Sequence, residues 1–261
     1  MPRATSLIHS GNISSMKIGI FTDHFYPELG GIQDSLEELS RELGRRGHIV
    51  HLWAPRASVN DFHIIGREHS EIQLGKTVTI HRIPSMHVMS PTRQSRIAIP
   101  YILPARDAFE ACEVIHTNSF FGVGLTVLSA ARRDNKPLIG TNHWAFAEFG
   151  DYFPPPLGAL FNKAALAYVN WYYGRCDYMT APGISTVNEQ TNSGFTTPHE
   201  AISNPIDTDT YRPATHDERE RLREKFGFTG PIITCVGRLA IEKKNDVVVR
   251  AFGIVDRKSV V

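Results

Sequence analysis

Two adjacent glycines near the N-terminus stand where a phosphate could bind. Gly30 and Gly31 follow a short apolar run that starts at Lys17, and they precede apolar residues at helical spacing, beginning with Ile32 and Leu36. Glycine leaves the backbone N–H groups open to close approach, and the N-terminus of a helix carries partial positive charge. The pattern therefore predicts a phosphate-binding site at Gly30 and Gly31. The alternative is a tight turn, which is a common use of glycine.

Other polar residues near strand ends could also take part in chemistry. Asp23 and His24 follow the first apolar run, so we expect them to line a cleft, in roles that the sequence does not separate. His116 lies within an apolar strand and is interpreted as a core residue with satisfied ring nitrogens. His143 is one of twelve histidines, and by itself it would be interpreted as structural.

The elements that position these residues alternate between strand and helix. From Lys17 to Pro55 the pattern predicts a strand, a helix closed by Gly47 and a second buried strand. Further strands are predicted at Val78–Ile83, Val114–His116, Leu138–Thr141, Tyr178–Ala181 and Ala201–Ser203, and helices at Gly122–Arg133 and Leu157–Arg175. This alternation predicts an α/β fold with a Rossmann-like, doubly wound parallel sheet, which binds ligands beyond the carboxyl ends of its strands.

Composition narrows the possible classes of protein. A chain of 261 residues can form one large domain or two small ones, and its net charge of +1 gives no electrostatic case for a nucleic-acid partner. The three cysteines are scattered without metal-ligand pairing, and no apolar run is long enough to span a bilayer. Residues 1–15 lack the apolar stretch of a signal peptide and are predicted to be a disordered leader. We therefore expect a cytoplasmic protein.

The pattern changes after Asn204. Residues 16–208 are predicted to form an N-terminal domain, and residues 209–229 a linker with a charged helix. Residues 230–261 then show one strand pattern and one helix pattern. Because one strand and one helix cannot enclose a core, we expect this segment to be the start of an incomplete C-terminal domain.

An ordered set of segments resembles a known family. Between Met16 and Phe252 the chain contains FTDHFYPELGGIQDSLEELSRELGRRGHIVHLWAP, VIHTNS, GTNHW, MTAPGIST, NPIDTDTYRP and VGRLAIEKKNDVVVRAF. In this order they resemble the retaining GT-B glycosyltransferases of family 4. The resemblance implies two Rossmann-like domains facing each other across a cleft, with the acceptor bound by the first domain and most of the sugar nucleotide by the second.

The resemblance also implies roles for individual residues. Gly30 and Gly31 would approach a donor or acceptor phosphate, and Arg238 and Lys243 would neutralise the diphosphate as it leaves. His143 would lie beside the transferred sugar. No metal is expected, because this basic pair would neutralise the diphosphate. No cofactor is expected either, because the sugar nucleotide, such as UDP-hexose or GDP-mannose, is a substrate. Retention is explained in this family by front-face attack, in which the leaving phosphate takes the proton of the acceptor hydroxyl.

The chain departs from the family pattern at several places. Asn118 stands where a second histidine is frequent, and Gly183 stands where serine is common. The family's glutamate pair, which holds the nucleotide ribose and the donor sugar, would follow the last residue of this sequence. The expected function is therefore a retaining hexosyltransferase, and the alternative is an inactive fragment or an acceptor- or lipid-binding module without a donor site. An NAD-dependent oxidoreductase is disfavoured, because the loop from Phe21 to Gly31 is too long for a G-x-G-x-x-G turn.

A membrane lipid is one candidate acceptor. The first segment resembles family members that glycosylate diacylglycerol or phosphatidylinositol. Residues 144–173 are rich in aromatics, and Arg93, Arg96 and Arg106 surround apolar residues, a composition that suits peripheral contact with the inner face of a membrane. Ordinary helix packing beside an acceptor pocket is the alternative.

Overall fold

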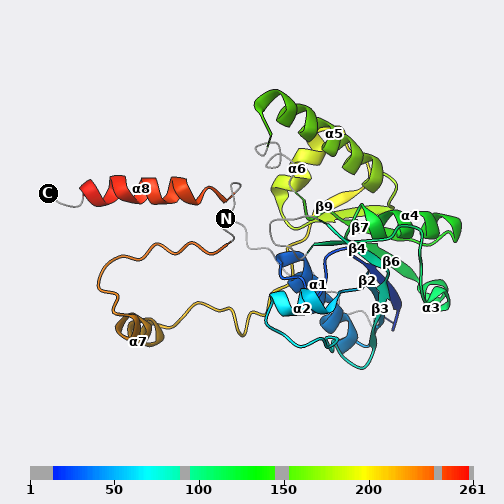
Figure 1. The fold of residues 1–261 in the computed structure, drawn as a ribbon, viewed down its shortest axis with the longest axis horizontal. Coiled ribbons are helices and arrows are strands. Elements are labelled where there is room, and N and C mark those ends of the chain that lie inside the picture. The colour runs from blue at the N-terminus through cyan, green and yellow to red at the C-terminus, as the bar shows by residue number, and fades with distance from the viewer. Residues whose placement is uncertain (1–13, 89–94, 145–152, 238–242, 259–261) are drawn as a thin grey trace. The chain divides into compact units, whose positions relative to one another are not determined.

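The chain divides into two units in the computed structural model (Figure 1), which describes residues 14–88, 95–144, 153–237 and 243–258. The first unit runs to His143 and resumes over Val169–Pro205. The second unit comprises Trp144–Tyr168 and Ile206–Val261. All residues of the parallel sheet belong to the first unit.

The first unit is built on a seven-stranded sheet in the order β3-β2-β1-β6-β7-β8-β9. Every neighbouring pair in this sheet is parallel. The strands are β1 (Lys17–Phe21), β2 (Ile49–Pro55), β3 (Val78–Ile83), β6 (Val114–Thr117), β7 (Leu138–Thr141), β8 (Tyr178–Ala181) and β9 (His199–Ala201). The predicted doubly wound parallel sheet is confirmed. The prediction for the last strand was wrong by two residues, because pairing with β8 begins at His199.

The strand order reverses beside β1. The chain moves outward from β1 through β2 to β3, and then crosses to the other side of β1 to form β6. Such a switch point leaves a crevice beyond the carboxyl ends of the two central strands, where doubly wound folds bind ligands. Between β3 and β6 a small antiparallel pair forms, β4 (Ser85–His87) with β5 (Arg96–Ala98), which sequence patterning did not predict.

Helices follow most of the strands. They are α1 (Gly31–Arg45), α2 (Val59–Ile64), α3 (Arg106–Ala111), α4 (Gly122–Arg133), α5 (Pro155–Tyr173), α6 (Ile184–Asn192), α7 (His216–Phe226) and α8 (Asn245–Lys258). As predicted, Gly47 closes the first helix, with a φ of 88° that favours glycine. None of the described helices is both long enough and apolar enough to cross a membrane.

Both faces of the sheet are buried, as the apolar strands require. On one face Ile20 and Leu52 pack with Leu36 of α1. On the other face the ring of Trp53 stacks on Phe21 with centroids 4.5 Å apart, and Phe109 of α3 meets Phe21 edge-on. Alternate residues of each strand point to opposite faces, which explains how one strand serves two cores.

The second unit contains α7, α8 and the part of α5 up to Tyr168. Thr215 caps α7 in a capping box with Glu218, and Gly227 ends the helix in the left-handed conformation. The strand expected after residue 230 is not formed: residues 231–237 are exposed and pair with none of the described strands. An isolated strand lacks partners for its backbone groups, so an apolar pattern alone does not produce one. The helix expected after it is present as α8.

Candidate active site

Polar residues gather where the central strands end. Asp23 follows β1, Asn118 and Ser119 follow β6, and Asn142 and His143 follow β7. Because these strands are parallel neighbours, their carboxyl ends lie at one edge of the sheet. Asp23, Asn118, Ser119 and Asn142 are all buried. This edge coincides with the switch point in strand order, so it is the candidate active site.

His143 is held at this edge as a neutral ring. Its Nε2 lies 3.0 Å from Oδ1 of Asn118. Burial lowers the pKa of His143 to about 3, and the nearby His116 and His24 add to this effect. Its Nδ1 is buried without a hydrogen-bond partner in the described chain. The structure therefore presents an uncharged imidazole with one unsatisfied nitrogen, while the role of His143 stays a prediction.

His116 is a core residue, as the sequence indicated. Its Nε2 lies 2.7 Å from Oγ1 of Thr141, and that hydroxyl lies 2.7 Å from Oγ1 of Thr180. Burial lowers the pKa of His116 to about 4, so its ring is neutral at neutral pH. These contacts join β6, β7 and β8 side by side. His116 therefore supports the sheet beneath the candidate site.

Asp23 connects three elements around the end of β1. Its Oδ1 accepts hydrogen bonds from the N–H groups of Ala98 at 3.0 Å and Val123 at 3.2 Å. Its own N–H donates to Oγ of Ser119 at 2.7 Å. Burial raises the pKa of Asp23 to about 6, and the two backbone bonds offset only part of that effect. Asp23 therefore positions β5 and the start of α4, which separates its role from that of His24.

His24 forms an ion pair on the loop before α1. Its Nδ1 lies 3.0 Å from Oε2 of Glu28, and Oε1 of Glu28 accepts a hydrogen bond from Ser95 at 3.3 Å. Burial alone would lower the pKa of His24. The hydrogen bond to Glu28 and the charges of Glu28 and Asp23 together have the larger effect, so the pKa lies above its ordinary value. The attraction between His24 and Glu28, four residues apart, thus stabilises the loop that leads to Gly30.

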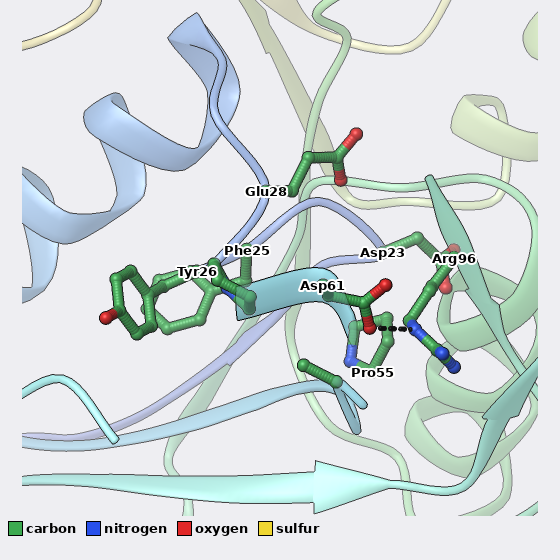
Figure 2. Close-up of a pocket in the computed structure, with 9 residues that line it drawn as sticks. Asp23, Phe25, Tyr26, Glu28, Pro55, Asp61 and Arg96 are labelled. Atoms are coloured by element: carbon green, nitrogen blue, oxygen red, sulfur yellow. Dashed lines mark hydrogen bonds and ion pairs between the residues drawn. The ribbon is translucent and has the colours of Figure 1, made fainter. Parts of the chain in front are cut away.

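A small hollow opens beside this loop (Figure 2). It has a volume of about 240 Å³, its open mouth included. It is lined by Asp23, Phe25, Tyr26, Pro27, Glu28, Pro55, Ala57, Asp61 and Arg96. Figure 2 shows Asp61 and Arg96 facing each other, with Nε of Arg96 2.6 Å from Oδ2 of Asp61. Burial alone would raise the pKa of Asp61. The hydrogen bonds from Ser58 and Arg96 have the larger effect, so the pKa lies below its ordinary value.

The paired glycines are placed at the start of α1, as predicted. Gly30 is the N-cap and Gly31 is the first helical residue. The φ of Gly30 is 175°, which is extended backbone that any residue adopts, and a Cβ at either glycine would meet nothing within 4 Å. Neither strain nor packing within the described chain therefore requires glycine here. The N–H groups of the first helical turn have no helical acceptor, as at every helix start. Phosphate binding by this pair stays a prediction.

Only one member of the predicted basic pair lies among the described residues. Arg238 lies outside the described residues. Lys243 is exposed in the second unit, shortly before α8, whereas Gly30, Gly31 and His143 belong to the first unit. The phosphate-binding roles of Arg238 and Lys243 therefore stay predictions. Among residues 14–88, 95–144, 153–237 and 243–258, no three His, Cys, Asp or Glu side chains group as metal ligands would.

Sequence reasoning missed two contacts at this edge. Asn118 was noted only as a departure from the family pattern, yet it contacts His143 directly. The ion pair of Asp61 with Arg96 was also missed. The sequence does contain a signal for the position of Asp61, because Ser58 and Asp61 have the spacing of a helix capping box. In the structure the Ser58 N–H donates to Asp61 at 2.6 Å.

Comparisons with known proteins agree with this architecture. The family model described as Glycosyltransferase Family 4 matches residues 29–210. A GDP-mannose-dependent alpha-mannosyltransferase of Mycobacterium tuberculosis is 27% identical over 233 residues, covering 88% of this chain and 58% of that protein. An alpha-monoglucosyldiacylglycerol synthase of Streptococcus pneumoniae is 25% identical over 156 residues, covering 59% of this chain and 32% of that protein. The chain thus spans less than two thirds of the length of these relatives.

Solved structures support the fold. Sucrose-phosphate synthase from Thermosynechococcus elongatus superposes with a TM-score of 0.54 at 13% identity, over 80% of this chain and 52% of that one. Anabaena HepE in complex with UDP-glucose gives a TM-score of 0.50 at 13% identity, over 81% and 50% of the two chains. The predicted GT-B type of fold is confirmed. Together with the family model, which matches more than half of the chain, these findings show that the chain belongs to glycosyltransferase family 4.

Proposed function

We propose that the chain contributes the acceptor side of a retaining hexosyltransferase that uses a sugar nucleotide. The observation that carries the proposal is His143, a neutral ring at the switch point of the sheet. Its Nδ1 is buried and has no hydrogen-bond partner among the described residues. An unsatisfied buried acceptor costs about 1–3 kcal/mol, so a ligand that donates to it gains that amount. A sugar hydroxyl is such a donor.

The paired glycines support a phosphate beside this sugar. Gly30 and Gly31 are exposed at the positive end of α1, with open space where side chains would be. Backbone N–H groups there would stabilise the negative charge that develops on the departing diphosphate. Arg238 and Lys243 would add cationic charge to the same leaving group. The leaving phosphate would take the proton of the acceptor hydroxyl, so the mechanism needs no metal, no cofactor and no carboxylate nucleophile.

The donor would be a hexose nucleotide. Relatives of this chain are named for mannosyl transfer from GDP-mannose and for glucosyl transfer to a lipid. Both GDP-mannose and UDP-hexose therefore stay candidates, and the acceptor would be a hydroxyl compound. The proposed setting of the reaction is the cytoplasm. The alternative is a chain that binds an acceptor or a lipid without turnover.

A lipid acceptor has support from α5 and less from the basic residues. Leu157 and Leu160 of α5 are 57% and 64% exposed, and Phe161 packs near Phe153. Arg96 and Arg106, however, are engaged in ion pairs with acidic residues, and Arg93 lies outside the described residues. These ion pairs weaken the support for the basic-apolar surface that the sequence predicts. The proposal of peripheral membrane contact therefore rests on the exposed apolar face of α5.

The decisive experiment is a transfer assay with labelled GDP-mannose and UDP-glucose. It is made on the 261-residue chain and on any extended chain that the source gene encodes. The expected result is hexose transfer or donor hydrolysis that falls at least about tenfold in His143→Gln, since one hydrogen bond is lost. The matched control is His63→Gln, on an exposed histidine of α2. Activity of His143→Gln equal to wild type would reject the role of His143. Activity only in the extended chain would establish the alternative for the 261-residue chain.

The lipid acceptor needs its own measurement. Leu157→Ser with Leu160→Ser in one chain is expected to reduce co-sedimentation with anionic vesicles at low salt, because it removes apolar area from the exposed face of α5. A paired change of two exposed apolar residues elsewhere, Leu222→Ser with Phe226→Ser in α7, is the control. Equal sedimentation of all three chains, or none by wild type, would refute membrane contact through α5.

A further inference from the structure

Asn118 and His143 meet at the sheet edge although 25 residues separate them in sequence. Asn118 directly follows β6, and the residue is 1% exposed. Its backbone N–H donates to the carbonyl of Phe21 at 2.8 Å, which ties it to the end of β1. The amide that faces His143 is therefore held by the two central strands of the sheet.

This amide determines which ring nitrogen carries the proton. Oδ1 of Asn118 lies 3.0 Å from Nε2 of His143. With Oδ1 facing the ring, only a protonated Nε2 completes this hydrogen bond, because a carbonyl oxygen has no hydrogen to give. A neutral imidazole has a single N–H, which leaves Nδ1 with a lone pair. That Nδ1 is the atom that is buried without a hydrogen-bond partner in the part of the chain that the structure describes.

We infer that Asn118 is a positioning residue that holds His143 as the Nε2–H tautomer and makes Nδ1 an acceptor for a hydroxyl of the transferred sugar. The identity of the hydroxyl rests on the proposed function, but the tautomer does not. His143 then orients the sugar and has no proton to give to the leaving group from the side of Nδ1. Its part in the reaction is to accept a hydrogen bond.

Two further observations support this arrangement. Nδ2 of Asn118 is also buried and has no hydrogen-bond partner within residues 14–88, 95–144, 153–237 and 243–258. A donor and an acceptor without partners there thus belong to the same pair of side chains. A sugar hydroxyl carries both functions. An asparagine also does not titrate, so it presents the same hydrogen-bonding groups to His143 throughout the physiological pH range. Asn118 therefore makes the tautomer of His143 independent of pH over the physiological range.

Nuclear magnetic resonance of the whole chain with isotope-labelled histidine tests the tautomer without any assay of activity. The His143 signals are assigned by their loss in His143→Gln. The expected result is a protonated Nε2 and an unprotonated Nδ1, with no titration between pH of about 5 and 8. Addition of GDP-mannose or UDP-glucose is expected to shift Nδ1 and not Nε2. A protonated Nδ1 in the free chain would overturn the inference, and a ligand that binds without shifting Nδ1 would overturn its second half.

Variants at Asn118 separate positioning from mere support of the fold. Asn118→Leu removes the acceptor, so the His143 signals should become those of a tautomer mixture, and kcat should fall about tenfold with the donor KM changed less than about twofold. Asn118→Asp keeps the oxygen and adds a charge, so His143 should titrate at a higher pH. Asn60→Leu, on an exposed residue of α2, is the matched control. It should change neither the His143 signals nor kcat.

The outcomes distinguish this inference from the proposed function. An unchanged His143 tautomer in Asn118→Leu would refute the positioning role, and so would an unchanged kcat in an active enzyme. If wild type shows no transfer with any donor, the proposed function fails. The tautomer of the free chain and its response to Asn118→Asp still decide whether Asn118 positions His143.

Discussion

The guanidinium of Arg96 lies 2.6 Å from the carboxylate of Asp61, with only 16% and 4% of the two side chains exposed. Arg96 belongs to β5 and Asp61 to α2, so the pair joins the small antiparallel ladder to the helix that follows β2. It does so beside the hollow at the end of β1, as Figure 2 shows. A buried ion pair of this kind specifies geometry, because neither charge tolerates the loss of its partner.

Removal of either partner should therefore be costly. Asp61→Ala leaves the Arg96 charge without its carboxylate, and we expect it to reduce the free energy of unfolding by about 3 kcal/mol. Urea denaturation of wild type, Asp61→Ala, Arg96→Ala and the double variant measures the coupling between the two residues. The control is Arg45→Ala, which breaks an exposed pair and should cost at most about 1 kcal/mol. A cost of Asp61→Ala no larger than this control would contradict the prediction.

Asp23 should make stability depend on pH. Its folded pKa of about 6 lies above the ordinary value of 3.8, so the folded state holds the proton more tightly than the unfolded state. Stability from this group is present at low pH and is lost as pH rises from about 4 to about 6, by about 3 kcal/mol. Asp23→Asn keeps an acceptor for Ala98 and Val123, so it should lose this dependence while remaining folded. Unfolding free energies of both chains across that range provide the check, and parallel curves would disprove the assignment.

His116 should act in the opposite direction. Its folded pKa of about 4 lies below the ordinary 6.5, so the unfolded state takes up the proton first. The stability contributed by the neutral ring is present above a pH of about 6.5 and is lost as pH falls toward 4. His116→Gln should flatten this part of the acid unfolding curve, which circular dichroism can follow. The exposed His63→Gln is the control, and an equally steep curve for His116→Gln would refute the prediction.

Alanine at Gly31 should separate ligand binding from stability. A Cβ at Gly31 meets nothing within 4 Å, so Gly31→Ala should leave stability unchanged or raise it by up to about 1 kcal/mol, since alanine favours helix. Donor turnover should nevertheless fall at least about tenfold if a phosphate approaches the backbone here. Thermal unfolding and the transfer assay are measured side by side on this variant.

Gly19→Ala gives the contrasting case. A Cβ at Gly19 would lie 2.9 Å from Cδ1 of Ile115 and 3.3 Å from the ring of Trp53, so this change should destabilise the protein by about 1–3 kcal/mol. Full turnover by Gly31→Ala, or an unaltered stability of Gly19→Ala, would show that the two glycines are not distinguished in this way.

The amino-acid sequence by itself predicted most of the sheet of the first unit. Apolar runs punctuated by glycines located β3, β7 and β8 with their observed bounds, and helical spacing located α4 likewise. These elements are recoverable because burial on both faces of a parallel sheet imposes a local pattern on each strand. Where pairing decides, the pattern failed: β9 begins at His199 because β8 pairs there, and Pro231–Gly237 forms no strand.

Only the tertiary structure decided the contacts of the candidate site. His143 meets Asn118 across 25 residues, Arg96 meets Asp61 across 35, and Asp23 meets Ala98 across 75. Motifs identified His143 and the glycine pair as candidates, but they carry no information on hydrogen-bond partners so distant in sequence. Those partners depend on the order of the strands and on the reversal beside β1, which no local periodicity encodes. Protonation follows from the same cause, because burial at that edge is what keeps His143 neutral.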